Sequence, residues 1–196
     1  MAILKIKKYG ENVLRQKSKE VTKISKKIQV LIENLVDTMY HNNGVGLAAP
    51  QVGENVRIFV IDVTEPNEAP DPIIFINPKI IKKEGAINSY EGCLSFPQMY
   101  TNVRRYETVK VKALNFNGKP FVIEAKEGSL LARAIQHEFD HLDGVLFIDH
   151  CRNRFETDKI LADKGLAPTD PNYLIDEKEL EEEIQKLPPV EEKQVD

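Results

Sequence analysis

The sequence predicts an α+β fold with mostly antiparallel sheet in a compact single domain. Helical periodicity occurs near the start of the chain and again after residue 128, and the segments between them alternate in the manner of strands. A length of 196 residues is enough for one domain with a hydrophobic core. We expect this domain to span residues 1–173 and an acidic tail to follow over 174–196.

The first half of the chain contains four recognisable segments. Residues 3–9 alternate apolar side chains with lysines, which is typical of a short strand or an extended arm. Apolar residues three and four apart predict an amphipathic helix over 21–41, which the run Asn42-Asn43-Gly44 should end. Residues 57–63 indicate a buried strand, and the proline-rich stretch 65–72 a loop.

The middle of the chain is rich in strand signals. Residues 73–76 and 79–81 are expected to form two strands, separated where Asn77-Pro78 breaks the pattern. Residues 108–114 and 120–125 alternate on either side of an Asn-Gly turn and predict a hairpin.

A second helix is expected over residues 130–142. Gly128-Ser129 precedes it as a cap, the segment contains no Gly or Pro, and Gly144 should stop it. The following segment, 151–171, is polar and we expect it to be irregular. A charged helix over 174–187 is expected within the tail, where Pro188-Pro189 would end it.

The composition is that of a soluble protein, with 41% hydrophobic and 30% charged residues. The chain shows neither a signal-peptide pattern nor an apolar run of the ~20 residues that span a membrane, so no membrane association is expected. Two cysteines, Cys93 and Cys151, suggest no disulfide framework and therefore a reducing, cytoplasmic location.

The net charge of −4 is unevenly distributed along the chain. Residues 176–196 contain nine acidic residues and three lysines, so the rest of the chain carries a balance of +2. Because nucleic acids attract clustered Lys and Arg, the tail is not expected to bind them.

The sequence His137-Glu138-Phe139-Asp140-His141 has the form H-E-x-x-H. On a helix, His137 and His141 lie on one face and can bind one divalent ion, with Glu138 beside it as a general base. The motif alone is also compatible with an exposed, charged helix.

A catalytic metal usually has three protein ligands and one open position. In many zinc proteases the third ligand follows soon after the two histidines, and this chain has four candidates there: Asp149, His150, Cys151 and Glu156. The upstream alternative is Cys93, although a lone cysteine is more often a small buried residue.

Residues 44–53 form the third unusual segment. Their small side chains would let the backbone approach an extended peptide, and Gln51 offers an amide donor for a developing oxyanion. The alternative is a glycine-rich turn between helix and strand. The segment lacks the Lys and Ser/Thr of a phosphate-binding loop, which argues against nucleotide binding.

Together, segments 44–51, 91–95 and 136–141 resemble the three motifs of the peptide deformylase family, over roughly residues 3 to 150. The resemblance implies antiparallel sheets packed around a central metal-binding helix, with an N-terminal helix and, in this chain, a C-terminal helical extension. It also implies removal of the formyl group from the N-terminal formyl-methionine of newly made proteins. The implied ligands of one divalent metal are Cys93, His137 and His141. The family typically uses Fe²⁺ in the cell and accepts Zn²⁺, Ni²⁺ or Co²⁺.

The resemblance also implies roles for further residues. Glu138 would transfer protons, while the Gln51 side chain and the Leu94 backbone amide would bind the oxyanion. The peptide would pair with backbone near Val45-Gly46. The expected pocket for the methionine side chain is formed by Gly92, Leu130, Arg133 and Ala134. Glu91 and Arg105 are expected either to form an ion pair that fixes the Cys93 loop or to be two solvated charges.

The expected partners are formyl-methionyl peptides and nascent chains, with brief proximity to the ribosome and no direct nucleic-acid binding. Two other functions remain open at this point: an H-E-x-x-H endopeptidase with a downstream third ligand, and a non-catalytic module that binds metal or peptide. The presence of both Glu138 and Gln51 favours an enzyme.

Overall fold

The computed structural model describes residues 2–175. Most of the expected acidic tail, with its helix over 174–187, therefore lies outside the described residues. Within them are helices α1 (Lys26–His41), α2 (Leu130–Leu142) and α3 (Arg154–Asp163), and short 3-10 turns η1 (Asn12–Arg15), η2 (Ala49–Val52) and η3 (Phe147–His150). The strands are β1 (Gly46–Ala48), β2 (Ile58–Ile61), β3 (Ile73–Glu84), β4 (Ile87–Cys93), β5 (Phe96–Arg105), β6 (Thr108–Leu114) and β7 (Pro120–Ala125).

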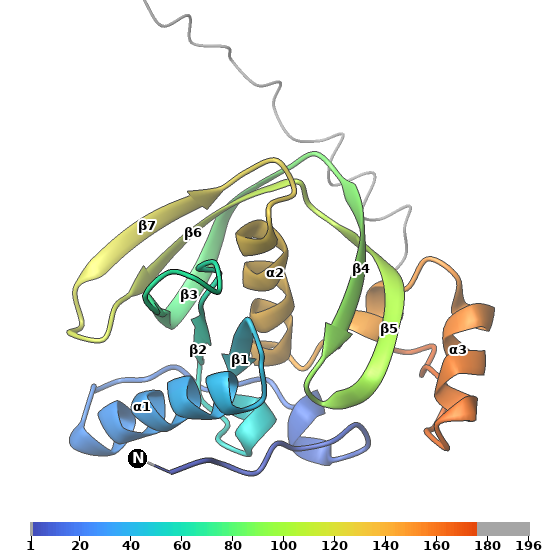
Figure 1. The fold of residues 1–196 in the computed structure, drawn as a ribbon, viewed down its shortest axis with the longest axis horizontal. Helices are drawn as coiled ribbons and strands as arrows, with labels where there is room; N and C mark the ends of the chain where they lie inside the picture. Colours follow the sequence, from blue (N-terminus) through green and yellow to red (C-terminus); the bar gives the residue numbers. More distant parts are fainter. Residues whose placement is uncertain (1, 176–196) are drawn as a thin grey trace, which may run out of the picture.

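Helix α2 lies between two antiparallel sheets (Figure 1). One sheet has five strands in the order β1-β2-β3-β6-β7, and the other is the hairpin β4–β5. Helix α1 packs on β1 and β2, away from α2. The predicted α+β class, with antiparallel sheets around a central helix, is confirmed.

Helix α1 is shorter than predicted. It begins at Lys26 because the Ser25 side chain caps it by accepting a hydrogen bond from the Ile28 N–H. The preceding residues Val21 and Ile24 still pack against the core, which explains why they extend the helical pattern of the sequence. The helix ends as expected at Asn42, and Asn43 has a positive φ of 53°.

Strand β3 is continuous, so the prediction of two separate strands was wrong. Asn77-Pro78 forms a bulge, at which Asn77 has a φ of 49° and the register with β6 shifts. The Asn77 side chain bonds both the N–H and the carbonyl of Val21, which ties the N-terminal segment to the sheet. Residues 3–8 form an extended arm without strand pairing.

Two further elements differ from the sequence prediction. The hairpin β4–β5 was not predicted, and residues 151–171, expected to be irregular, contain α3. Asn153 caps α3 by accepting from the Glu156 N–H, and Thr157 and Leu161 are buried on its inner side. Besides these, only Ile160 is a partly buried apolar residue of α3, so the apolar stripe that normally reveals a helix is narrow.

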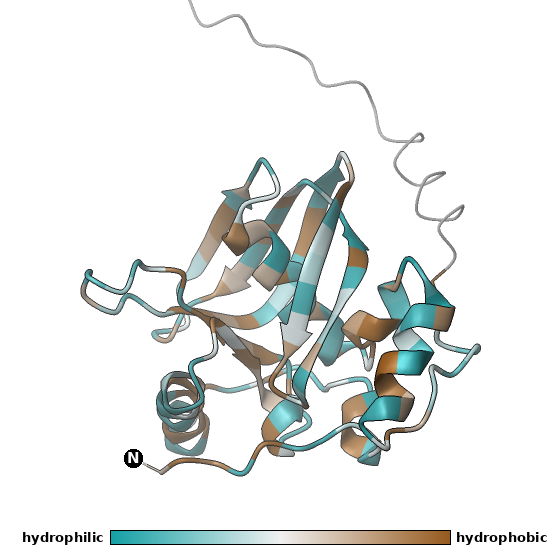
Figure 2. Ribbon diagram, turned by 45° about the vertical axis from the view of Figure 1, so that its right-hand side comes forward, coloured by the Kyte–Doolittle hydropathy of each residue, from teal (hydrophilic) through white to brown (hydrophobic). Residues whose placement is uncertain are grey.

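The core on which the site rests is formed where α2 meets the large sheet. Ala132, Ile135 and Leu142 of the helix pack with Phe59 and Phe75 of the strands, and all five are fully buried. Burial of each large apolar side chain contributes about 1.5–3 kcal/mol. Hydrophobic and hydrophilic residues alternate along several strands (Figure 2), whereas β2 is apolar and buried throughout.

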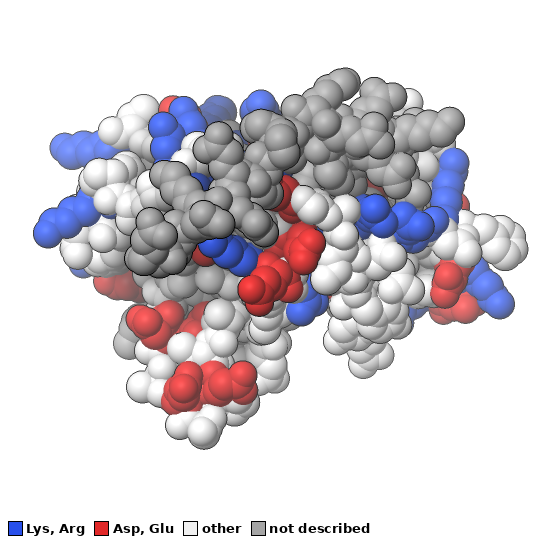
Figure 3. Space-filling model, turned by 90° about the horizontal axis from the view of Figure 1, so that it is seen from above, with Lys and Arg blue, Asp and Glu red and all other residues white. Residues whose placement is uncertain are grey.

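The surface carries charges of both signs. On the face drawn in Figure 3, Lys and Arg lie interspersed with Asp and Glu among the described residues. Within residues 2–175, no helix has the length and apolar composition that a membrane crossing requires.

Candidate metal centre and active site

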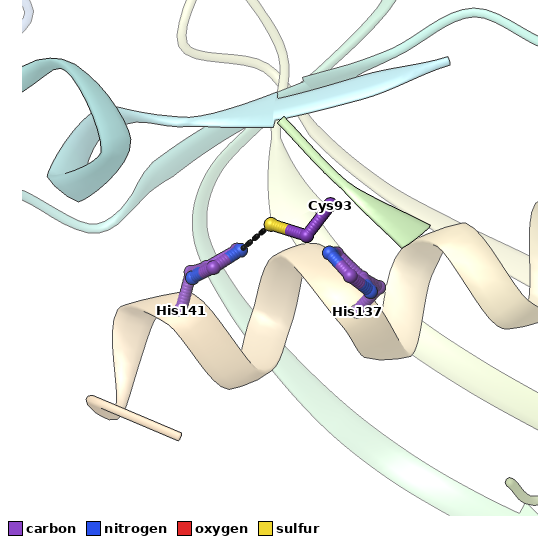
Figure 4. A group of neighbouring side chains, drawn as sticks. All are labelled: Cys93, His137 and His141. Carbon is purple, nitrogen blue, oxygen red and sulfur yellow. Dashed lines mark hydrogen bonds between the residues drawn. The ribbon is translucent and has the colours of Figure 1, made fainter. Parts of the chain in front are cut away.

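Helix α2 presents His137 and His141 on one face. Its bounds match the prediction, because Ser129 caps it by accepting from the Ala132 N–H and Gly144 follows it with a φ of 75°. Both histidines are buried, and Figure 4 shows their rings pointing to the same side of the helix.

Cys93 faces these histidines from the end of β4, where the hairpin register shifts. Its sulfur lies 3.3 Å from His141 Nε2, and the ligand atoms of Cys93, His137 and His141 all lie within 4.8 Å of one another. The structure thus brings together the three side chains that the resemblance implies as ligands, although Cys93 precedes His137 by 44 positions in the chain.

The donor set fits a divalent transition metal. A thiolate with two imidazoles suits zinc, iron, cobalt or nickel. Burial raises the pKa of Cys93, but the two neighbouring histidines outweigh it and hold the pKa well below its usual range. The lowered pKa favours the thiolate, which is the form in which cysteine binds metal.

Glu138 lies beside this cluster and is buried. Its Oε2 atom is buried and has no hydrogen-bond partner among the described residues, so its capacity to accept a hydrogen bond is unused. Burial raises the pKa of Glu138 to about 7, against the opposing effect of His137 and His141. The carboxylate packs on Gly46, where a Cβ atom would come within 2.5 Å of Glu138 Oε1. Only glycine leaves room for it.

Gln51 is buried in η2 and is oriented by two sets of contacts. Its Oε1 accepts from the Ala48 N–H at 2.8 Å, and its Nε2 lies 3.4 Å from both Cys93 Sγ and Ser95 Oγ. The amide donor therefore faces the cluster. Ser95, which helps to hold it, is a site residue that the sequence reasoning missed.

Glu91 and Arg105 form a buried ion pair, which confirms the first of the two sequence alternatives. Arg105 Nη2 donates to Glu91 Oε2 at 2.8 Å, and Arg105 Nε donates to Oε1 at 3.0 Å. The same Oε2 lies 3.1 Å from His137 Nδ1. Because a carboxylate can only accept, Nδ1 carries the proton and Nε2 is left for a metal. Burial alone would raise the pKa of Glu91, but Arg105 and His137 hold it well below its usual range.

A cavity of about 490 Å³ opens in front of the cluster. Its lining includes every residue expected to bind substrate: Val45, Gly46, Gly92, Leu130, Arg133 and Ala134. Leu94, Gln51 and Glu138 line it as well. The Arg133 guanidinium donates to Gly128 O and Ser89 Oγ, both at 3.1 Å, so it is held in place. Two exposed tyrosines that were not predicted, Tyr90 and Tyr100, stack on each other and line the same cavity.

The downstream candidates for a third ligand have other partners or lie elsewhere. Asp149 is buried against Arg15 and accepts from the Leu146 N–H. His150 Nε2 bonds Asp140, and Glu156 is exposed on α3. Cys151 lies outside the cluster of ligand atoms. This arrangement counts against an endopeptidase of the H-E-x-x-H type.

An α+β fold with a Cys-His-His cluster whose histidines are buried, a buried glutamate beside it and an adjoining cavity defines a metallohydrolase. Comparison with known proteins identifies the family within this class. Residues 3–156 match the family model described as polypeptide deformylase, and the chain belongs to that family. It is a metal-dependent hydrolase that removes the formyl group from the N-terminal methionine of new proteins.

Several relatives are similar over most of their length. The peptide deformylase of Thermodesulfovibrio yellowstonii is 48% identical over 81% of this chain and all of its own. Peptide deformylase 1 of Clostridium perfringens is 49% identical over 76% of this chain and 99% of its own. Among solved structures, a peptide deformylase from Synechococcus elongatus in complex with actinonin has 42% identity and a TM-score of 0.79, covering 88% of this chain and 90% of its own. The Thermotoga maritima enzyme has 42% identity and a TM-score of 0.72, covering 78% and 100%.

Proposed function

We propose that Cys93, His137 and His141 hold one divalent ion and that Glu138, Gln51 and the Leu94 backbone amide perform the deformylation beside it. The observation that carries this proposal is the buried Glu138 carboxylate, with one unpartnered oxygen, next to a Cys-His-His cluster at a substrate-sized cavity. When bound, the ion supplies Lewis acidity, which acidifies water and polarises the formyl carbonyl.

We propose Fe²⁺ as the ion in the cell, with Zn²⁺, Ni²⁺ or Co²⁺ able to replace it in the isolated protein. One thiolate and two imidazoles accommodate all four ions, so the donor set supports the group of metals rather than one member. Metal content of protein prepared without oxygen decides which ion is native.

Glu138 acts as the general base and then as the general acid. It takes a proton from the attacking water and delivers it to the amine of the departing methionine, so that one side chain performs both proton transfers. The site supports this role through the position of Glu138 next to the ligands and the space that Gly46 leaves for it.

Gln51 and Leu94 stabilise the negative charge that develops on the formyl oxygen. The Gln51 amide already faces the cluster. The Leu94 carbonyl, in the peptide unit that follows the Leu94 N–H, accepts from Lys8 Nζ at 2.9 Å. Loss of one such donor typically costs about 2.7–4 kcal/mol in the transition state.

The substrate is proposed to bind as an extended chain along β1. Among residues 2–175 this strand pairs with β2 alone and forms one edge of the five-stranded sheet, so its other edge can pair with a peptide. Val45-Gly46 lies at that edge. The methionine side chain would enter the pocket formed by Gly92, Leu130, Arg133 and Ala134. We expect the enzyme to act in the cytoplasm on nascent chains close to the ribosome, without direct binding to nucleic acid or membrane.

The two cysteines allow a matched test of this proposal. Cys93→Ser should lose metal and hydrolysis of formyl-Met-Ala-Ser together, whereas Cys151→Ser should keep both, since Cys151 lies outside the cluster. The acetylated peptide measures specificity for formyl, and actinonin, which is bound in the Synechococcus elongatus structure, serves as a probe of the cavity. Full metal content and full activity in Cys93→Ser would refute the ligand assignment. They would favour instead a third ligand that follows His141 in the chain.

A further inference from the structure

A continuous series of contacts leads from the metal cluster to the opposite side of α2. It begins with His137 and Glu91, and continues through Arg105 to Asp140 and His150. Arg105 Nη1 donates to Asp140 Oδ2 at 2.5 Å, and the same oxygen lies 2.9 Å from His150 Nε2. As the carboxylate accepts both bonds, Nε2 of His150 carries the proton.

The members of this series come from four different elements. Glu91 belongs to β4, Arg105 to the end of β5, Asp140 to α2 and His150 to η3. Arg105 thus binds the hairpin and the helix at the same time. Since Cys93 lies two residues after Glu91 and His141 directly follows Asp140, this guanidinium joins the two segments that supply the ligands.

Asp140 and His150 are outside the catalytic cavity. They line a second, charged cavity of about 940 Å³ on the other side of α2, and neither lines the cavity that contains Glu138. The side-chain contacts that connect them to the metal cluster run through Arg105 and Glu91.

Arg105 needs its partners because it is almost completely buried, at 2% exposure. A buried charge is tolerated only when it is paired and hydrogen-bonded. Glu91 occupies the Nε and Nη2 donors on one side, and Asp140 occupies Nη1 on the other. Without Asp140, the guanidinium has one fixed side instead of two.

His150 holds Asp140 from the outside. Its turn η3 is anchored by the neighbouring Asp149, which pairs with Arg15 and accepts from the Leu146 N–H. Its Nδ1 atom is buried without a partner among the described residues, so the bond to Asp140 is the contact that orients the ring.

We propose that Asp140 and His150 are positioning residues for the metal centre. They hold Arg105, and through it Glu91, in the arrangement that keeps the Cys93 strand against the histidine helix. The inference rests on the ligand assignment proposed above. It gives His150, one of the downstream candidates for a ligand, a role three contacts away from Glu91, the carboxylate partner of His137.

The test measures metal binding by the full chain rather than activity. Asp140→Asn keeps the size of the side chain and removes its charge. The matched control is Asp143→Asn, at the end of the same helix, where the carboxylate pairs with Arg57 and lies outside the series. Co²⁺ affinity is measured by competition with a chelator, and the absorption band of thiolate bound to Co²⁺ reports the position of Cys93.

We expect Asp140→Asn to weaken Co²⁺ binding by about 10–100-fold, as is typical of residues that orient a ligand, and to shift the thiolate band. Asp143→Asn should change neither. His150→Ala should weaken binding by about tenfold, at the lower end of the same range. His150→Gln should restore most of the affinity, because its amide N–H can take the place of Nε2.

Equal affinities and spectra in Asp140→Asn and Asp143→Asn would overturn the inference. Should Asp140→Asn fail to fold, the His150 pair decides: no loss in His150→Ala, or no recovery in His150→Gln, would overturn it. Absence of the thiolate band in the unaltered protein would instead refute the Cys93 assignment, and with it both proposals.

Discussion

Helix α2 and the hairpin β4–β5 both supply metal-site residues, yet they depend on the sequence in different ways. The bounds of α2 follow from local signals: the Ser129 cap, a run without Gly or Pro, and Gly144. The hairpin is defined by its partners, because Glu91 meets Arg105 across the pair and both bind α2. One half of the site is therefore encoded locally, and the other half only through tertiary contacts.

The largest expected effect concerns the helix half of the site. Glu138→Gln should retain the metal, because Glu138 is not among the ligand atoms, and should lower kcat by about 10²–10⁴-fold through loss of proton transfer. Steady-state kinetics with formyl-Met-Ala-Ser on metal-analysed samples measures it. A metal-loaded variant with unchanged kcat would assign the base elsewhere.

The hairpin half should be the more sensitive to loss of core packing. Phe96, at 1% exposure, stacks on Tyr9 and meets Phe147 edge-on, so Phe96→Ala should destabilise the protein by about 3–5 kcal/mol. Phe155→Ala is the matched control, because that ring is 82% exposed and its loss should change stability by no more than about 0.5 kcal/mol. Denaturant unfolding of both variants gives the comparison, and similar values for the two would show that the hairpin does not rely on this cluster.

Contact between the β1 segment and the helix can be tested at Gly46. In Gly46→Ala the new methyl group would collide with Glu138, and a displacement of about 1 Å can cost about 10²-fold in kcat. Adding Glu138→Asp, which shortens the carboxylate by one methylene, should make the two effects strongly non-additive. Simple additivity in the kinetic cycle would mean that Gly46 acts in some other way.

The smallest expected effect tests the local encoding of α2. Ser129→Ala removes the cap and should cost about 1 kcal/mol of stability, while Ser129→Asp should restore most of it. Thermal unfolding distinguishes the two. A loss of several kcal/mol would mean that Ser129 has a tertiary role beyond capping.

Most of the fold was predictable where the apolar residues recur with the period of the strand or helix that contains them. Strands β6 and β7 and helix α2 were predicted with the bounds they have, because most of their apolar residues are at least partly buried, Val122 and Leu130 being exposed. Strand β4 was missed for the opposite reason. Its buried positions are Ser89 and Glu91, and its neighbour Tyr90 is 66% exposed, so the usual alternation is inverted. Residues that serve the site replaced the apolar side chains that would have revealed the strand.

The site shows the same division. Cys93, His137, His141 and Gln51 were recognised from motifs, and the Glu91–Arg105 ion pair was one of two alternatives that the sequence left open. The space that Gly46 leaves for Glu138, and the contacts of Asp140 with Arg105 and His150, depend on how separate segments meet. The sequence pattern of a single segment does not predict these contacts.

The central claim is that one metal is held jointly by the hairpin and the helix, and X-ray absorption of the zinc-loaded protein tests it most directly. The account predicts one sulfur ligand at about 2.3 Å together with imidazole nitrogens at about 2.0–2.1 Å, and loss of the sulfur in Cys93→Ser. A zinc shell of nitrogen and oxygen alone in the unaltered protein would contradict it.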